Sequence, residues 1–305
     1  MRVRFEWFWP GFDPHNNFFV DALNLHYDHV QVITDKLAKC ELEIVSVHSP
    51  LKHPYLARYV NLRSRIPHGQ PDINLLYPTI FEPETKNFLR RIWYGVENIR
   101  PPSQPNIDGS ISFDQDPLDG YNAYFPTWYE LSGIQRPFQN TRVDKLTSAE
   151  ELLKDRQFIG GKTKFACAFI GKPEQMRLRA ITELGKIGQV DVFGPFVGKP
   201  VANKSEVAKG YRFMVCFEND LYPGYVTEKI LEAYLADTVP LYWGDLGKDT
   251  AINRKCFLNL RDFESMEEWV DKVRNLSDDA YIDVYEQAHL NYVPSLKAVY
   301  KILTG

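Results

Sequence analysis

Short apolar runs alternate along this chain with amphipathic stretches that follow turns. The run YRFMVCFE, residues 211–218, is almost continuously apolar, as in a strand buried within a parallel sheet. The stretch TEKILEAYLAD, residues 227–237, has a helical period instead. Four of its apolar residues share one helix face: Ile230, Leu231, Tyr234 and Leu235. Strands and helices that alternate in this way favour a doubly wound α/β fold with parallel sheets.

The same alternation predicts two α/β stretches on either side of a turn-rich middle. The first contains strands at residues 3–9, 29–34, 42–48, 73–80 and 90–97, and a helix at 13–27 with Asp13 as N-cap and Pro14 at the first helical position. The second contains strands at residues 163–170, 189–193, 211–218, 238–244 and 256–260. Its helices are predicted at residues 173–188, 227–237 and 265–276, the last with a Ser265–Glu268 capping box. Residues 98–156, rich in Pro, Gly and aromatics, are predicted to be binding loops or a linker.

Length and composition support a two-domain soluble protein. The chain has 305 residues, 44% hydrophobic and 25% charged, with a net charge of −4. This length suits two domains, predicted at residues 1–150 and 151–305 with the C-terminal helix packing back on the first. The acidic balance argues against a nucleic-acid partner. No apolar run is long enough for a transmembrane segment, and Glu6, Pro10 and Asp13 interrupt the N-terminal apolar residues, so we expect a cytoplasmic protein.

The cysteines and several short motifs suggest no cofactor site. The four cysteines are isolated, which favours buried thiols in a reducing compartment: Cys40, Cys167, Cys216 and Cys256. The GGKT at residues 160–163 lacks the first glycine of a P-loop and precedes a strand. A DQD at residues 114–116 offers carboxylates for a metal, but two carboxylates in a polar turn are more often solvated. His26 and His29 have no third ligand nearby.

The segment FENDLYPGYVTEK, residues 217–229, is the strongest candidate for a ligand site. Glu218 and Asn219 end a buried strand, so we expect them at the carboxyl edge of the sheet, where such folds bind ligands. Thr227, Glu228 and Lys229 are predicted to form the first turn of the next helix, whose free N–H groups and dipole suit a phosphate. The plainer alternative, equally weighted on Lys229 alone, is that Lys229 points to water beside Glu228.

Two further positions strengthen or extend this candidate. Arg177 lies in the first turns of the helix after the 163–170 strand, so it and Lys229 could converge on a pyrophosphate; Arg179 is the competing arginine. Glu228 suits ribose hydroxyls. In the first stretch, Glu97 ends an apolar strand beside Trp93 and Tyr94 and could act as a general base, although a simple turn-forming Glu-Asn pair explains it better on its own.

These segments resemble the α-1,3-fucosyltransferases of glycosyltransferase family 10, especially the bacterial members. The segment from Tyr211 to Gly244 is similar to the family signature: an aromatic-rich strand ending Phe-Glu-Asn, then Tyr-Val-Thr-Glu-Lys, a helix and a Pro-containing strand. CFLNLRDF at residues 256–263, RIWYGVEN at residues 91–98 and FDQD at residues 113–116 also resemble family segments. The resemblance covers roughly residues 91–263 and is loose in the middle.

The resemblance implies a GT-B fold, two Rossmann-like domains facing a central cleft, with an acceptor-binding first domain and a donor-binding second domain. It implies inverting transfer of L-fucose from GDP-fucose to N-acetylglucosamine, in an oligosaccharide or glycolipid of a surface glycan such as lipopolysaccharide. By the resemblance Glu97 matches the general base, and Arg177 and Lys229 match the cations that contact the donor phosphates. Asn219, Tyr225 and Glu228 match residues of the donor site. Enzymes of this type generally need no metal, so no cofactor is expected.

Two departures from the family pattern affect these expectations. Where many members have a polar pair before the arginine, this chain has Ile170 and Gly171. The change leaves open a transferase for another GDP-sugar, and a non-catalytic nucleotide-sugar or glycan-binding protein is the alternative of a different class. The basic amphipathic tail and heptad repeats of some bacterial relatives have no counterpart, nor does a Golgi-type N-terminal anchor, so we expect no membrane association. The end, SLKAVYKILTG, is at most one short helix.

Overall fold

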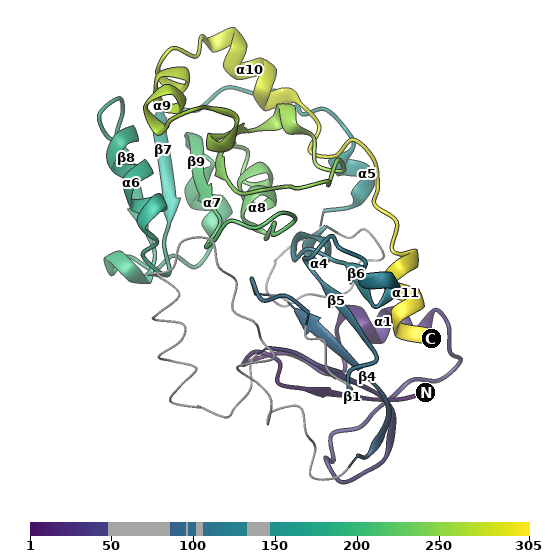
Figure 1. The fold of residues 1–305 in the computed structure, drawn as a ribbon. Helices are drawn as coiled ribbons and strands as arrows, with labels where there is room; N and C mark the ends of the chain where they lie inside the picture. The colour runs from purple at the N-terminus through teal and green to yellow at the C-terminus, as the bar shows by residue number, and fades with distance from the viewer. Residues whose placement is uncertain (48–85, 96, 102–105, 133–146) are drawn as a thin grey trace. The chain divides into compact units, whose positions relative to one another are not determined.

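The structure, a computed structural model, describes residues 1–47, 86–95, 97–101, 106–132 and 147–305 (Figure 1). The chain separates into two compact units. The first comprises Met1–Leu146 with Ser295–Gly305, and the second comprises Thr147–Pro294. Each unit contains one parallel sheet, as the alternating apolar runs predict. The strand predicted at residues 73–80 lies outside the described residues.

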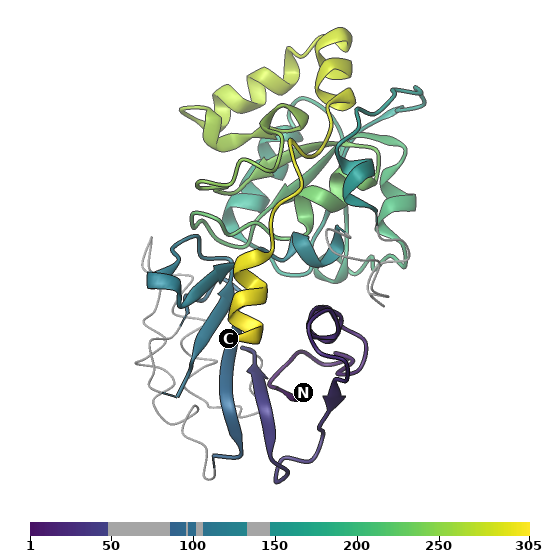
Figure 2. The same ribbon diagram turned by 90° about the vertical axis from the view of Figure 1, so that its right-hand side faces the viewer.

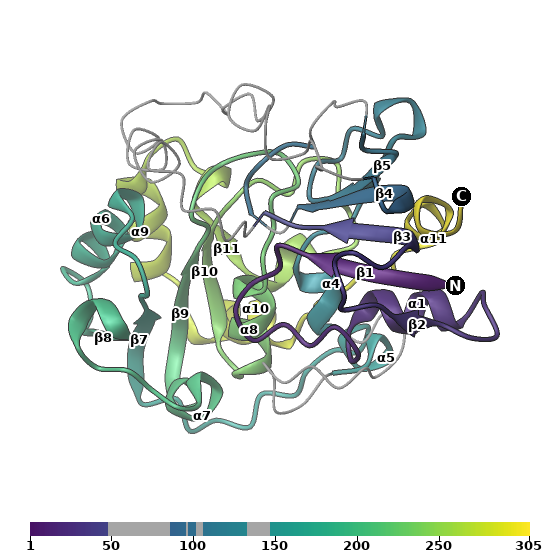
Figure 3. The same ribbon diagram turned by 90° about the horizontal axis from the view of Figure 1, so that it is seen from below.

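The first unit is built on a sheet with the strand order β2-β1-β3-β4-β5-β6, part of which can be followed in Figure 3. Every neighbouring pair in this sheet is parallel. The strands are β1 Arg2–Glu6, β2 Gln31–Val32, β3 Cys40–Val45, β4 Phe88–Gly95, β5 Gly109–Ser112 and β6 Asn122–Tyr124. Among the described part of residues 1–132, the helices are α1 Phe18–Asn24 and α4 Trp128–Leu131, and Leu118–Gly120 forms the 3-10 turn η1.

A buried ion network links three neighbouring strands of this sheet. Arg4, Glu43 and Arg91 stand opposite one another on β1, β3 and β4. Arg4 Nε donates to Glu43 Oε1 over 2.9 Å, and Arg91 Nε donates to Oε2 over 2.5 Å. Both oxygens of a buried carboxylate are thereby paired, as burial of a charge requires. A one-residue slip of any of these strands would leave charges unpaired, so the network helps fix the register.

The N-terminal segment differs from its prediction at both elements. Strand β1 ends at Glu6, because Trp7 takes a left-handed backbone conformation with φ 59° and cannot continue the strand. The helix begins at Phe18, not after Asp13. Asn17 caps it, accepting from the backbone N–H groups of Phe19 and Val20, and Asp13 instead accepts from the N–H of His15 in the preceding turn. The predicted N-cap at Asp13 is therefore wrong.

The final helix, α11 Lys297–Thr304, belongs to the first unit and lies against β5, β6 and α1 (Figure 2). Its apolar side packs inward through Val299, Ile302 and Leu303. Its last carbonyl groups lack helical partners, and Arg90 of β4 supplies one by donating from Nη2 to the carbonyl of Ile302 over 2.7 Å. A cation at this end also opposes the helix dipole favourably.

The second unit is built on a sheet with the strand order β11-β10-β9-β7-β8, again wholly parallel. The strands are β7 Lys164–Phe169, β8 Val190–Phe193, β9 Tyr211–Phe217, β10 Val239–Trp243 and β11 Leu258–Asn259. The helices are α5 Ala149–Leu152, α6 Gln175–Leu184, α7 Lys204–Ala208, α8 Lys229–Leu235, α9 Met266–Arg274 and α10 Asp278–Glu286. Short 3-10 turns connect them: η2 Pro195–Val197, η3 Arg254–Cys256 and η4 Leu260–Asp262.

Helices cover both faces of this second sheet. Side chains alternate along β9, so Phe213, Val215 and Phe217 enter one core cluster with Ala180 of α6 and Trp269 of α9. The intervening side chains point to the other face, on which α8 packs against β9 and β10. Figure 3 shows α6 and α9 on one side of the strands and α8 on the other. The last residues of β9 therefore lie between α6 and α8, so side chains from both helices can reach the end of this strand.

Two properties of the described residues bear on the earlier expectations. All four cysteines are buried and unpaired. Burial raises the pKa of Cys167 and of Cys256 to about 12, so both remain neutral thiols at physiological pH. Among the helices that the structure describes, none combines the length and the apolar character that crossing a bilayer demands.

Candidate functional site

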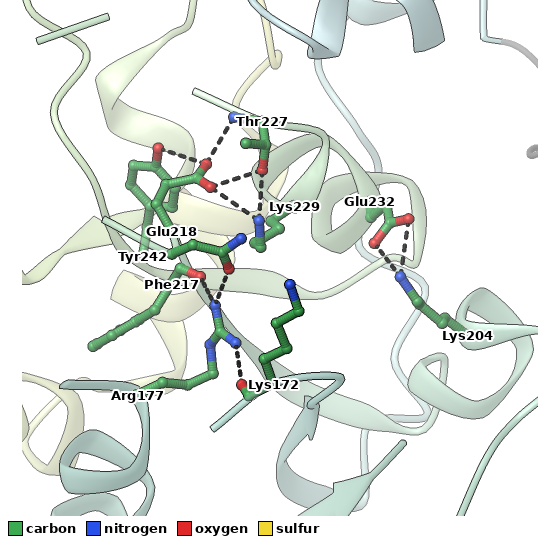
Figure 4. Close-up of polar contacts among 10 residues, drawn as sticks. Lys172, Arg177, Lys204, Phe217, Glu218, Thr227, Lys229, Glu232 and Tyr242 are labelled. Carbon is green, nitrogen blue, oxygen red and sulfur yellow. Dashed lines mark hydrogen bonds and ion pairs between the residues drawn. The ribbon is translucent and has the colours of Figure 1, made fainter. Parts of the chain in front are cut away.

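The carboxyl end of β9 holds a fully buried carboxylate, Glu218, which follows the last strand residue (Figure 4). Its side chain lies on the α8 side of the sheet, as the alternation along β9 requires. Oε1 accepts from the N–H of Thr227 over 2.8 Å and from the hydroxyl of Tyr242 over 3.1 Å. Oε2 accepts from the hydroxyl of Thr227 over 2.7 Å and from Lys229 Nζ over 3.1 Å. Four donors thus compensate the buried charge.

Lys229 is the positive partner of this carboxylate. Its side chain is 20% exposed, and its ammonium group also donates to the hydroxyl of Thr227 over 2.9 Å. Burial lowers the pKa of Lys229, but the carboxylates of Glu218 and Glu228 outweigh burial, so the net shift is upward and the group is charged at neutral pH. Two of its three N–H donors are engaged, which leaves one donor on the partly exposed side for a ligand.

Arg177 approaches the same strand end from the opposite side of the sheet. It projects from α6, is 5% exposed, and donates from Nη2 to the carbonyl of Phe217 over 2.6 Å and to Asn219 Oδ1 over 3.1 Å. Its Nη1 donates to the carbonyl of Lys172 over 3.3 Å. Burial lowers the pKa of Arg177, against the opposing effect of the Glu218 carboxylate. The structure therefore favours Arg177 over Arg179, whose exposed side chain pairs with Glu267 on the surface.

A glycine on the neighbouring strand end allows Tyr242 to reach Glu218. A Cβ at Gly244 would lie 2.2 Å from the Tyr242 hydroxyl oxygen and 2.5 Å from the ring carbon that bears it. The Tyr242 ring thus folds back over Gly244 while its hydroxyl group donates to Glu218. Any larger residue at position 244 must displace this ring, so Gly244 helps position a ligand of the buried carboxylate.

The other predicted residues of this segment differ in how far they are exposed to solvent. Tyr225 is 2% exposed, and Asn219 is exposed with its side-chain oxygen held by Arg177. Glu228 is half-buried at the N-cap position of α8. The helix begins at Lys229, so the prediction that Thr227 opens its first turn is wrong. The Thr227 N–H is bonded to the Glu218 carboxylate, so it is also not free for a phosphate.

We name Glu218, Asn219, Thr227, Lys229 and Arg177 the β9 corner. The sequence predicts Asn219, Lys229 and Arg177 as site residues, and the structure brings all three to it. The sequence did not predict that Tyr242 would donate to Glu218 and that this pair would help hold the corner together. The sequence signal for Glu218 was a charged residue directly after the apolar run FMVCF, at a position that alternation places on a buried face. Tyr242 gives no such signal, because a tyrosine in an apolar strand has many uses.

Glu97 lies in the first unit, in a tight turn directly after β4. Its carbonyl accepts from the N–H of Ile99 over 2.6 Å, and its side chain is exposed. Trp93 and Tyr94 are buried, and the carboxylate that meets the Tyr94 hydroxyl is Glu130 of α4. The Glu97 carboxylate is therefore exposed to solvent just after β4, while Trp93 and Tyr94 are buried, and the role of Glu97 as a general base stays a prediction.

The DQD segment has a structural use in the first unit. Asp114 is buried and pairs with Arg100 Nε over 2.7 Å, while its Oδ1 accepts from the N–H of Asp116. Asn122 donates to the carbonyls of both aspartates over 2.8 Å. In the described part of the chain no three His, Cys, Asp or Glu side chains gather as a metal site would need. The segment is a turn of the first unit that these hydrogen bonds hold in place.

Comparison with known proteins finds a family match within the second unit. Residues 159–293 match the model for glycosyltransferase family 10 (fucosyltransferase), C-terminal part. An alpha-(1,3)-fucosyltransferase from Helicobacter pylori is 37% identical over 110 residues, which cover 35% of this chain and 23% of that protein. The human 4-galactosyl-N-acetylglucosaminide 3-alpha-L-fucosyltransferase 9 is 28% identical over 116 residues, which cover 36% and 32%. The matches span about a quarter to a third of these relatives.

Solved structures extend the likeness to the whole chain. Crystal structures of an alpha1,3-fucosyltransferase superpose with TM-scores of 0.66 and 0.67, the latter with GDP-fucose bound. The superpositions cover 100% of this chain and 90% of the other, at 21% and 20% identity. At that identity the likeness assigns the fold, which is the GT-B type with two parallel-sheet α/β domains. The fold class expected from the resemblance is thereby confirmed.

Proposed function

We propose that this chain, which carries a glycosyltransferase family 10 domain in its second unit, transfers L-fucose from GDP-fucose to a hydroxyl of an N-acetylglucosamine-type acceptor in a surface glycan, with inversion. The observation that carries the proposal is the β9 corner inside the family-matched residues: a buried carboxylate and two cations at the carboxyl edge of a parallel sheet. This edge is where doubly wound folds bind nucleotides. The α-1,3 linkage follows the names of the relatives.

In this scheme the β9 corner binds the donor and stabilises the leaving group. The departing GDP gains negative charge as the bond to the fucose anomeric carbon breaks. The positive charges of Arg177 and Lys229 oppose that gain, with the remaining N–H donors of each directed at phosphate oxygens. Because these cations are already held by Phe217, Asn219 and Glu218, little reorganisation is needed during the reaction. Tyr225 and Glu228 would line the nucleoside side of the site, and no metal is required.

Glu97 is the proposed general base. The acceptor hydroxyl loses its proton to the Glu97 carboxylate as its oxygen attacks the anomeric carbon from the side opposite the GDP, which inverts the configuration there. The exposed position of Glu97 at the end of β4 gives an acceptor access to it. General-base catalysis of this kind contributes roughly 100-fold to 10,000-fold in rate.

Product analysis tests this assignment. The purified protein is incubated with GDP-fucose and N-acetyllactosamine, and NMR of the product gives the linkage and anomeric configuration. We expect an inverted fucoside and a decrease in kcat of about 100-fold or more in Glu97→Gln, with GDP affinity unchanged. Glu150→Gln, an exposed glutamate of α5, is the control and should retain full kcat. Unchanged turnover in Glu97→Gln would remove Glu97 from the mechanism.

The Ile170–Gly171 departure supports a second candidate, a transferase for another GDP-sugar. These residues follow β7 at the sheet edge, and a Cβ at Gly171 would have no atom within 4 Å. A side chain that many family members have here is replaced by open space, so the donor sugar can differ. Repeating the assay with GDP-mannose discriminates between the two: faster transfer of mannose than of fucose would favour this second candidate.

A further inference from the structure

The turn between β7 and α6 carries a cation that the β9 corner does not use. Lys172 follows Gly171 in this turn, and its carbonyl accepts from Arg177 Nη1. Its side chain is exposed, and within the described residues its ammonium group forms no hydrogen bond, ion pair or cation–π contact. Figure 4 shows this side chain running from the turn beside Arg177 in the direction of Lys229. A positive charge without a partner among the described residues thus lies at the same edge of the sheet as the β9 corner.

The charges of the β9 corner leave a need for another cation. Glu218 lies at the corner with both Arg177 and Lys229 and is ion-paired to Lys229, so it neutralises one of the two positive charges. The Glu228 carboxylate lowers the local positive potential further, and its effect is seen in the raised pKa of Lys229. A nucleoside diphosphate sugar carries negative charge on each of its two phosphates. One net positive charge from buried groups does not balance that ligand.

The hydrogen-bond geometry leads to the same conclusion. Both N–H groups at Arg177 Nη2 and two of the three at Lys229 are directed to protein acceptors. These cations therefore hold the corner together and have few donors left. Lys172 has all three of its N–H groups available. Its backbone is fixed near the corner by Arg177, while its long side chain can follow a ligand without breaking any internal pair.

We propose that Lys172 binds the pyrophosphate of the donor nucleotide and supplies the charge that the buried corner lacks. The inference rests on the proposed function of this unit and adds to it a residue for which the family motif gives no role. Lys172 stands directly after Ile170 and Gly171, where the polar pair of many family members is missing. In this proposal the Lys172 ammonium group contacts the phosphates from the turn after β7, where the polar side chains of those members are absent.

Calorimetric titration of the full chain with GDP and with guanosine tests the proposal. Lys172→Ala should weaken GDP binding about tenfold, the lower range for loss of a charge-assisted hydrogen bond, and should leave guanosine binding unchanged. Lys172→Arg should restore most of the GDP affinity. Lys272→Ala, an exposed lysine on α9, should bind GDP as the wild type does. The GDP difference should shrink in high salt, because exposed charges are screened.

The outcomes separate this inference from the proposed function. If the wild type binds GDP and Lys172→Ala binds it equally well, Lys172 has no phosphate role and only this inference falls. If Lys172→Ala weakens GDP and guanosine alike, its effect is structural and the inference also falls. A wild-type protein that binds no GDP would instead overturn the proposed function of the unit. Equal melting temperatures for wild type and Lys172→Ala confirm that the variant is folded.

Discussion

At the scale of single residues, Glu218 is the residue that holds Thr227 and Lys229 in the β9 corner. The buried carboxylate receives hydrogen bonds from Thr227, Lys229 and Tyr242, so it joins the end of β9, the start of α8 and strand β10. The sequence predicted both cations of this corner and the position of Glu218 at the sheet edge, but not the ion pair between Glu218 and Lys229. Apolar periodicity in the sequence shows where a strand ends. It does not show which residues will bond to Glu218, because one of them, Tyr242, is 24 positions away in the chain.

Replacing Glu218 by glutamine should therefore destabilise the protein strongly. The amide keeps the shape but leaves the Lys229 charge without its partner, and breaking a buried ion pair in this way costs about 3 kcal/mol or more. Because the pKa of Lys229 is raised in the folded state, the pair contributes fully at neutral pH and is lost only as the pH rises beyond the ordinary lysine range. Urea denaturation at neutral pH measures the difference.

The control for this variant is Glu267→Gln. Glu267 forms an exposed pair with Arg179 on the surface of the same unit, and such a pair contributes little to stability because solvent screens it. If the Glu218→Gln variant loses no more unfolding free energy than Glu267→Gln does, the buried network is not what holds the β9 corner together.

At the scale of elements, the long apolar runs were predicted well and the short polar ones were not. The strands that became β7, β9 and β10 and the Ser265 cap of α9 stand where the sequence predicts them. The short strands β5 and β6 lie in the predicted loop region, since sequences such as GSIS and NAY carry little apolar periodicity. The two strands are joined by backbone pairing and by Ser110 and Ser112, which both donate to the side chain of Asn122. That pairing is tertiary information.

The end of β10 offers a test at this scale. Gly244→Ala places a Cβ where the Tyr242 hydroxyl lies, so the ring must move away from Glu218. Overpacking of this kind costs about 1–3 kcal/mol, and the hydrogen bond to Glu218 is lost as well. Thermal or urea unfolding measures the loss. Gly210→Ala, at an open position just before β9, should be neutral or slightly stabilising; equal behaviour of the two variants would contradict the crowding at Gly244.

At the scale of the whole molecule, the alternation of strands and helices along the chain predicted two α/β units with parallel sheets, and the family resemblance implied the GT-B architecture. The sequence could not predict which acid and amide groups would meet, or that Arg90 would bond to the end of α11. The contact between Arg90 and Ile302 joins residues 212 positions apart, and chain topology rather than local preference brings them together.

We expect His289 to make the second unit sensitive to acid. This histidine is fully buried beside Tyr234 and Cys256, and burial lowers its pKa to about 3 from 6.5. A lowered histidine pKa gives stability that is complete above the unfolded-state pKa and is lost as the pH falls below it. Between about pH 7.5 and 5.5 the expected loss in unfolding free energy is about 1.4 kcal/mol.

Urea denaturation at those two pH values, on the wild type and on His289→Gln, isolates this contribution. The variant removes the titrating ring, so its unfolding free energy should fall less on acidification than that of the wild type. An equal fall in both proteins would show that His289 is not responsible for the acid sensitivity.

The central claim is that the β9 corner of the second unit is a binding site for a guanine nucleotide sugar. Thermal unfolding of the pure protein with GDP, UDP, GDP-fucose or GDP-mannose, in metal-free buffer, tests it most directly. Ligand at about 100 times its dissociation constant should add about 2.7 kcal/mol and raise the melting temperature by several degrees. We predict stabilisation by GDP and GDP-fucose and none by UDP. An unchanged melting temperature with GDP and GDP-fucose, or an equal increase with UDP, would contradict the account.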